Sequence, residues 1–158
     1  MNILVTGANG FVGKALCKRV ALNGWQVWGT VRSAEQAAGL PTGVEVVQIK
    51  SIGADTDWSG ALAGVDTVVH LAARVHVIKE TVSNLISEFR RVNVAGTESL
   101  VRMAEKAGVR RFVFLSSIGV NSDITHDQPF TEEDKPRPYN SYTLSKFEAE
   151  QVLLRIAS

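Results

Sequence analysis

Residues 2–13, NILVTGANGFVG, decide how the chain begins to fold. The run Asn2–Thr6 is mostly apolar, which predicts a buried strand. Glycines stand at positions 7, 10 and 13, and an amphipathic helical pattern starts among them and continues to Val20. Asn23 and Gly24 give this helix a plausible end. The apolar face expected for the helix comprises Phe11, Val12, Ala15, Leu16 and Val20.

Short β-rich runs alternate with helical patterns along the rest of the chain, which favours a parallel sheet covered by helices. The further strands are expected at Gln26–Val31, Val44–Ile49, Val65–Ala72 and Arg111–Ser117. The further helical segments are expected as a short helix or loop at 34–43, a turn at Trp58–Leu62, a helix at Ser83–Ala107 and a last helix from about Pro138. The fold class is therefore α/β, a doubly wound parallel sheet of the Rossmann-like type, in one domain over residues 1–158.

Composition restricts the classes of function. The chain has 158 residues, 45% of them hydrophobic, and a formal net charge of +1, which describes a globular domain and gives no electrostatic reason to expect nucleic acid. The single cysteine, Cys17, cannot form an internal disulfide and is expected to be a core thiol. Neither a signal peptide nor a membrane-spanning run is recognisable, so we expect a cytoplasmic protein without a membrane partner.

The glycine-rich turn predicts a phosphate site because of its position between a strand and a helix. Gly7 would permit the tight turn, a later glycine would let a pyrophosphate approach the backbone, and another would allow close packing of the helix. The helix N-terminus offers unpaired N–H groups and the positive end of a dipole. An ordinary glycine-rich turn is the alternative interpretation of the same residues.

The end of the second strand bears on the cofactor. An acidic residue there favours NAD, but this chain has Val31 and then Arg32. A guanidinium matches a phosphate in charge and geometry, so the sequence favours NADP(H) held by Arg32 with help from Ser33, and NAD(H) stays possible. The alternative is that Arg32 is an ordinary solvated side chain.

Tyr142 and Lys146 are four residues apart and share one face of the last helix. A nearby ammonium stabilises a phenolate, which predicts a lowered tyrosine pKa suited to acid/base work, although this spacing also arises by chance. Tyr139 lacks such a partner because Thr143 stands four residues later.

Two serines, Ser116 and Ser117, end the last predicted strand, at the sheet edge where open α/β folds bind ligands. A hydroxyl there would hydrogen-bond a substrate oxygen, or it would merely cap a turn.

The motifs TGANGFVG, HLAA, NVAGT, FLSS and YTLSK, in this order, resemble the extended short-chain dehydrogenase/reductase family. The segments RVNVAGT, RRFVFLSSIGVNS and PFTEEDKPRPYNSYTLSKFEAE are similar to the branch of nucleotide-sugar epimerases and dehydratases, which includes UDP-sugar epimerases and 4-keto-sugar reductases of surface-polysaccharide synthesis. The resemblance implies Tyr142 as catalytic acid/base, Lys146 as its activator and ribose ligand, and Ser117 as the substrate-orienting hydroxyl. It further implies that the cofactor is bound by Gly7, Asn9, Gly10, Phe11, Val12, Gly13, Arg32, Ser51, Ile52, Leu71, Ala72, Ala73, Asn93, Tyr142 and Lys146.

Two positions depart from this family pattern. Ser51 stands where many relatives have an aspartate that holds the adenine amine, and Val31–Arg32 replaces the acid typical of epimerases that retain NAD. The second departure favours a reductase. Family members also continue into a sugar-binding region, so we expect residues 1–158 to be the cofactor-binding part of a longer enzyme, with little or no turnover by itself.

The expected function is therefore hydride transfer on a nucleotide-sugar substrate. The alternatives are an NADPH-dependent carbonyl reductase acting on a non-sugar ketone, and a non-catalytic NADP(H) sensor. A homodimer through the helices expected at 83–107 and 138–156 is possible. His70, His76 and His126 lack the spacing of a metal site, and His70 is expected to pack at a strand end.

Overall fold

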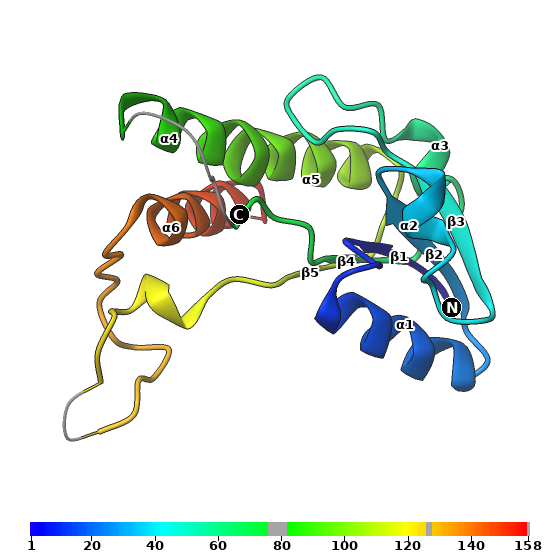
Figure 1. Ribbon diagram of the computed structural model, residues 1–158, viewed down its shortest axis with the longest axis horizontal. Helices are drawn as coiled ribbons and strands as arrows, with labels where there is room; N and C mark the ends of the chain where they lie inside the picture. The colour runs from blue at the N-terminus through cyan, green and yellow to red at the C-terminus, as the bar shows by residue number, and fades with distance from the viewer. Residues whose placement is uncertain (76–81, 126–127, 158) are drawn as a thin grey trace.

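A parallel five-stranded sheet forms the centre of the molecule, in the order β3-β2-β1-β4-β5 (Figure 1). The computed structural model describes residues 1–75, 82–125 and 128–157. The strands are β1 (Asn2–Thr6), β2 (Gln26–Val31), β3 (Val44–Gln48), β4 (Thr67–His70) and β5 (Arg111–Phe114). Because the chain runs outward from β1 to β3 and then returns to β4 on the other side of β1, the order reverses between β1 and β4. A ligand crevice is expected at the carboxyl ends of these two strands.

Helices cover both faces of the sheet. Helix α1 lies on one side, and α4, α5 and α6 lie together on the other (Figure 1). The helical elements are α1 (Phe11–Leu22), α2 (Ala34–Ala37), α3 (Ser59–Leu62), α4 (Val82–Phe89), the π-helical segment η1 (Arg90–Ala95), α5 (Gly96–Lys106), the 3₁₀ turn η2 (Ile118–Val120) and α6 (Ser141–Ala157). The expected doubly wound architecture is confirmed.

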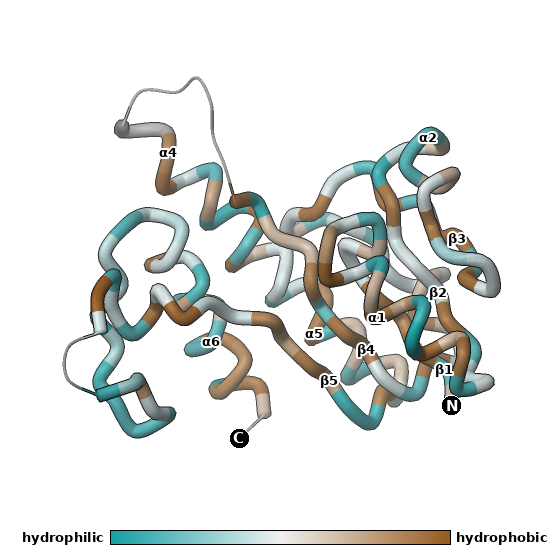
Figure 2. Tube along the Cα trace, turned by 60° about the horizontal axis from the view of Figure 1, so that its bottom comes forward, coloured by the Kyte–Doolittle hydropathy of each residue, from teal (hydrophilic) through white to brown (hydrophobic). Residues whose placement is uncertain are grey.

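The core has one cluster on each face of the sheet, because alternate residues of a strand point to opposite sides. Leu4 and Val68 pack with Trp58 and Leu100 toward α3 and α5. Val5 packs with its neighbours on the other face, where Cys17 of α1 is fully buried, as expected for a core thiol. Burial raises the pKa of the Cys17 thiol to about 11. Figure 2 shows the hydrophobic residues concentrated along the strands at the centre.

The buried face of α1 differs from the expected one. Gly13, Cys17 and Val20 are buried, whereas Phe11 is 97% exposed and Val12 is 47% exposed. The reason is the close approach of Gly13 to the glycine-rich turn, where a β-carbon on Gly13 would lie only 2.2 Å from the carbonyl oxygen of Gly7. This contact fixes the rotation of the helix, and Ala15 also stays exposed.

The predicted strands at 65–72 and 111–117 are longer than the observed ones. The amide of Val65 donates to the carbonyl of Leu62, and the amide of Ala72 donates to the hydroxyl Oγ1 of Thr6 at 3.1 Å rather than to a backbone carbonyl. After β5, Leu115 still donates to the carbonyl of His70, and the chain then leaves the sheet. Ile49 likewise lies just beyond β3.

The single helix expected at 83–107 is divided by the π-helical segment, and the last helix begins at Ser141 rather than near Pro138. Asn140 causes the later start, because its Oδ1 accepts a hydrogen bond from the amide of Thr143 at 2.8 Å and its own amide donates to Thr143 Oγ1. This reciprocal pair is an N-terminal cap. No helix of the described residues is long and apolar enough to cross a membrane.

Candidate dinucleotide site

The glycine-rich turn has the backbone geometry that an anion needs. Gly7 adopts φ +68°, and a β-carbon there would lie 2.9 Å from the amide nitrogen of Ala72, so this position requires glycine. Gly10 caps α1 without any side-chain hydrogen bond, and the first turn of α1 contains no acidic residue. The first-turn amides, at Phe11, Val12 and Gly13, have no carbonyl partner within the helix. The start of α1 therefore carries amide donors without helical partners and the positive end of the helix dipole.

A cavity of about 460 Å³ opens beside this turn. Nine of the residues predicted for the cofactor line it, namely Gly7, Asn9, Gly10, Arg32, Ser51, Ile52, Leu71, Ala72 and Ala73. The volume lies within the range of small-molecule sites. The structure thus brings together residues that follow β1, β2, β3 and β4, as the carboxyl edge of a parallel sheet allows. The predicted residues Phe11, Val12 and Gly13 lie at the start of α1 and are not part of the cavity wall.

Of the residues that the structure describes, four cationic ones and no aspartate or glutamate line the cavity. They are Arg32, Lys50, Arg74 and Arg91. This charge favours an anionic ligand. Sequence reasoning missed Lys50, Arg74 and Arg91 as site residues. Lys50 directly precedes Ser51, Arg74 directly follows HLAA, and Arg91 begins the segment RVNVAGT.

The loop after β3 is held rigidly against the rest of the cavity. Thr56 accepts a hydrogen bond from the amide of Gly53 at 2.9 Å and donates to the carbonyl of Ser51 at 3.1 Å. Gly96 at the start of α5 lets this loop approach, because a β-carbon on Gly96 would lie 2.4 Å from Ile52 Cγ2. The glycine of the NVAGT motif is therefore explained by packing against the loop.

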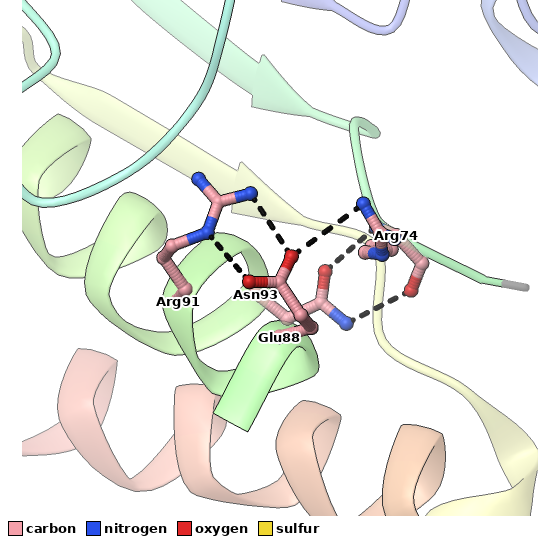
Figure 3. A network of polar contacts seen from close by, with 4 residues as sticks. All are labelled: Arg74, Glu88, Arg91 and Asn93. Atoms are coloured by element: carbon pink, nitrogen blue, oxygen red, sulfur yellow. Dashed lines mark hydrogen bonds and ion pairs between the residues drawn. The ribbon is translucent and has the colours of Figure 1, made fainter. Parts of the chain in front are cut away.

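Asn93 does not line the cavity but lies 2% exposed beneath it, in η1. Its Oδ1 accepts from the amide of Arg74 at 2.8 Å, and its Nδ2 donates to the carbonyl of Arg74 (Figure 3). The same Nδ2 donates to Ser145 Oγ at 2.9 Å. Ser145 in turn donates to the carbonyl of Tyr142. Asn93 thus connects the loop after β4 to the helix that carries Tyr142 and Lys146.

His70 is buried at the end of β4, as expected, but it also makes two hydrogen bonds that the sequence did not reveal. Its Nδ1 lies 2.6 Å from Thr6 Oγ1, and its Nε2 lies 3.0 Å from Thr97 Oγ1. Because the Thr97 hydroxyl donates to the carbonyl of Asn93 at 2.7 Å, it must accept from His70 Nε2. The ring is therefore the neutral Nε2–H tautomer, and Thr6 donates to Nδ1. Burial, together with the smaller influence of the Lys146 charge, lowers the pKa of His70 to about 3.

Lys146 is only 2% exposed, and its ammonium lies 3.9 Å from the ring centroid of Phe114. Burial lowers the pKa of Lys146 to about 8, against the opposing influence of Glu150. Tyr142 packs edge-on against Phe89, and burial raises its pKa. The expectation of a lowered tyrosine pKa is therefore wrong for this structure, because desolvation of the phenol dominates.

The two serines after β5 have different surroundings. Ser116 donates a hydrogen bond to the carboxylate of Glu150 on α6. Ser117 accepts one from the amide of Gly119 at 3.2 Å and caps the turn η2. Neither serine lines the cavity, nor do Tyr142 and Lys146. His76 and His126 lie outside the described residues.

Comparison with known proteins assigns the family. The sequence profile of the NAD dependent epimerase/dehydratase family matches residues 3–158, and the chain belongs to this family. A UDP-glucose 4-epimerase of Vibrio cholerae is 39% identical over 157 residues, which cover 99% of this chain and 47% of that protein. A 3-beta-hydroxysteroid dehydrogenase of Mycolicibacterium neoaurum is 33% identical over 161 residues, which cover 96% of this chain and 42% of that protein.

Solved structures agree with this assignment. MoeE5 in complex with UDP-glucose and NAD superposes with a TM-score of 0.83 at 31% identity, covering 100% of this chain and 50% of that protein. The chain thus spans about half the length of the relatives that it matches. The fold is Rossmann-like and corresponds to about half of the MoeE5 structure.

Proposed function

We propose that the protein binds a nicotinamide dinucleotide. We further propose that it is the cofactor-binding part of an enzyme that transfers hydride at a ring carbon of a nucleotide-linked sugar. The observation that carries this proposal is the cavity beside the glycine-rich turn, whose lining, over the residues that the structure describes, includes Gly7, Asn9 and Gly10 together with four cations and no carboxylate. Gly7 and Gly13 have no room for a β-carbon, which keeps the turn tight, and Gly10 lines the cavity without a side chain, which lets a pyrophosphate approach the backbone there. The residues present therefore fit this cofactor.

The proposed chemistry divides between the cofactor and three side chains. When bound, the nicotinamide ring supplies or accepts the hydride. Tyr142 gives a proton to the substrate oxygen when a carbonyl is reduced, and it takes the proton back when the alcohol is oxidised. Lys146 supplies a positive charge close to this proton transfer. Ser117 donates a hydrogen bond to the substrate oxygen that receives the proton. Ser116 is engaged with Glu150, which supports the choice of Ser117.

Lys146 has a property that suits this role. Because its pKa is lowered to about 8, the buried ammonium is poised to respond to a neighbouring negative charge. A phenolate on Tyr142 would stabilise the charged form of Lys146, and the ammonium would stabilise the phenolate in return. We infer that the two groups titrate as a pair once a cofactor and substrate exclude water.

The named relatives support a sugar nucleotide as the substrate class, since one is a UDP-glucose 4-epimerase and MoeE5 was solved with UDP-glucose. The steroid dehydrogenase among the relatives supports a second candidate, a carbonyl reductase acting on a non-sugar ketone. Arg32 lines the cavity and favours NADP(H) as the cofactor. NADP(H) suits a reductase of keto-sugar nucleotides as well as a reductase of non-sugar ketones. MoeE5, by contrast, was solved with NAD.

Replacement of Tyr142 tests the enzymatic proposal. Tyr142→Phe, in a polypeptide that includes the substrate-binding part, should lower kcat by about 10²- to 10⁴-fold because the proton donor is lost. NADPH consumption with a 4-keto-sugar nucleotide and UDP-glucose epimerisation are the two assays. Tyr139→Phe is the matched control, since Tyr139 is 55% exposed and lies outside α6.

The outcomes separate the candidate functions. If the wild type is active and Tyr142→Phe keeps the same kcat, the assigned role of Tyr142 is contradicted. Turnover of simple ketones, with none of sugar nucleotides, transfers the proposal to the second candidate. NADP(H) binding without turnover of either class indicates a sensor.

A further inference from the structure

Arg91 lines the cavity beside the loop that follows β3. Its Nη1 lies 3.7 Å from the position that a β-carbon would take on Gly53. The opposite edge of the guanidinium faces Glu88 of α4, where Nε donates to Oε1 at 3.3 Å and Nη2 donates to Oε2 at 3.1 Å. Both hydrogen bonds lie along one edge of the planar group (Figure 3). Its flat faces take no part in this pairing.

Glu88 also links Arg91 to a second wall of the cavity. Its Oε2 lies 3.7 Å from Nη1 of Arg74, which follows β4 (Figure 3). The pKa of Glu88 is lowered, first by the hydrogen bonds from Arg91 and then by the positive charges of Arg91 and Arg74. The carboxylate is therefore ionised at neutral pH and restricts the orientation of Arg91.

The arrangement of the cavity indicates which part of a dinucleotide reaches Arg91. The glycine-rich turn receives the pyrophosphate, and the end of β2, with Arg32, receives the adenosine ribose. The adenine must then extend toward Ser51 and Ile52 of the loop after β3, which line the same cavity. Ser51 offers no carboxylate to the adenine amine, and its backbone carbonyl already accepts from Thr56. Another contact has to hold the ring in place.

We propose that Arg91 stacks its guanidinium on the adenine ring of the bound dinucleotide, and that Glu88 is a positioning residue that orients it. Planar guanidinium groups stack favourably on aromatic faces, and nucleobases offer such a face. The inference rests on the proposed function, because it assumes that the cavity holds a nicotinamide dinucleotide. It assigns the adenine contact to η1 rather than to the loop after β3.

Calorimetric titration with the two halves of the cofactor tests this proposal. ADP-ribose carries the adenine, whereas nicotinamide mononucleotide does not. Arg91→Met should weaken ADP-ribose binding by about 5- to 30-fold, since the stacking plane is lost, and should leave the mononucleotide unaffected. Arg91→Lys should weaken ADP-ribose as well, because it keeps the charge but not the plane.

Two further variants complete the experiment. Arg102→Met is the matched control, because Arg102 pairs with Glu98 at 2.8 Å on α5 in a similar way and does not line the cavity. It should bind both halves as the wild type does. Glu88→Gln should weaken ADP-ribose by less than Arg91→Met does. Thermal unfolding of each variant verifies that it is folded.

The results distinguish the two levels of the proposal. If the wild type binds ADP-ribose and Arg91→Met binds it equally well, the stacking contact is refuted while the proposed function stands. Full affinity in Arg91→Lys refutes stacking in favour of a simple charge contact. Full affinity in Glu88→Gln removes the positioning role of Glu88. If the wild type binds neither half nor the intact dinucleotides, the proposed function itself fails.

Discussion

The hydrogen bonds of His70 make the stability of the protein depend on pH in a way that a single substitution can isolate. His70→Leu removes the acceptor for the Thr6 hydroxyl and the donor to Thr97, and both threonines are buried. An unsatisfied buried hydroxyl costs about 1–3 kcal/mol, and a lost hydrogen bond costs about 1 kcal/mol. The variant should therefore be less stable by about 2–4 kcal/mol at pH 7.5.

The difference should shrink in acid. The pKa of His70 is about 3 in the folded protein and has an ordinary value of 6.5, so between these pH values the unfolded chain binds a proton that the folded protein does not. The free energy of unfolding of the wild type therefore falls as the pH decreases through this window. At pH 5 the loss amounts to about 2 kcal/mol, and the leucine variant does not share it. Its deficit should fall to about 0–2 kcal/mol.

Urea unfolding followed by circular dichroism, at pH 7.5, 6 and 5, measures both free energies. Carboxylates such as Asp66 titrate in both proteins and cancel in the difference. Lys146, whose ammonium lies 3.9 Å from the centroid of the Phe114 ring that stacks with His70, disfavours protonation of His70 by its charge. A stability difference between wild type and His70→Leu that stays constant from pH 7.5 to 5 would refute the assigned tautomer and its buried neutral state.

Two further predictions concern the cations of the site. Arg32→Met should weaken NADPH binding by about 10- to 100-fold and leave NADH binding unaffected in calorimetric titrations. Arg19→Met on α1 is the control. Equal losses of affinity for the two coenzymes would overturn the phosphate-binding role of Arg32. Lys146→Met should abolish turnover yet raise the free energy of unfolding at pH 7 by about 1–3 kcal/mol, because it removes an ammonium whose pKa burial lowers to about 8. Decreased stability of this variant in urea would indicate that the contact with Phe114 outweighs the desolvation of Lys146.

The architecture was predictable because its signals are local. The apolar run Asn2–Thr6 and the turn after it gave the first strand and helix with correct boundaries. The errors arose where a contact distant in sequence overrides a local pattern. Gly13 turns α1 so that Phe11 faces solvent, and Asn140 delays α6 by capping it.

The candidate site was predictable in part. Residues next to glycines or strand ends were found because the carboxyl edge of a parallel sheet collects them. Arg74 and Arg91 were missed, since only the folded chain brings Glu88 between them. The pKa of Tyr142 was predicted in the wrong direction because spacing along a helix reveals the nearby charge but not the burial of the phenol.

The π-helical segment η1 joins α4 and α5 into one continuous helix whose two halves pack against different elements. In an α-helix each residue advances the face by about 100°. The wider turn at Arg90–Ala95 changes this phase, so that Phe89 meets Tyr142 on α6, while Leu100 meets the sheet. Deleting one residue here would yield a more regular helix but would rotate its two halves relative to each other, so that Arg91 at the cavity and Phe89 against Tyr142 could no longer both keep their contacts.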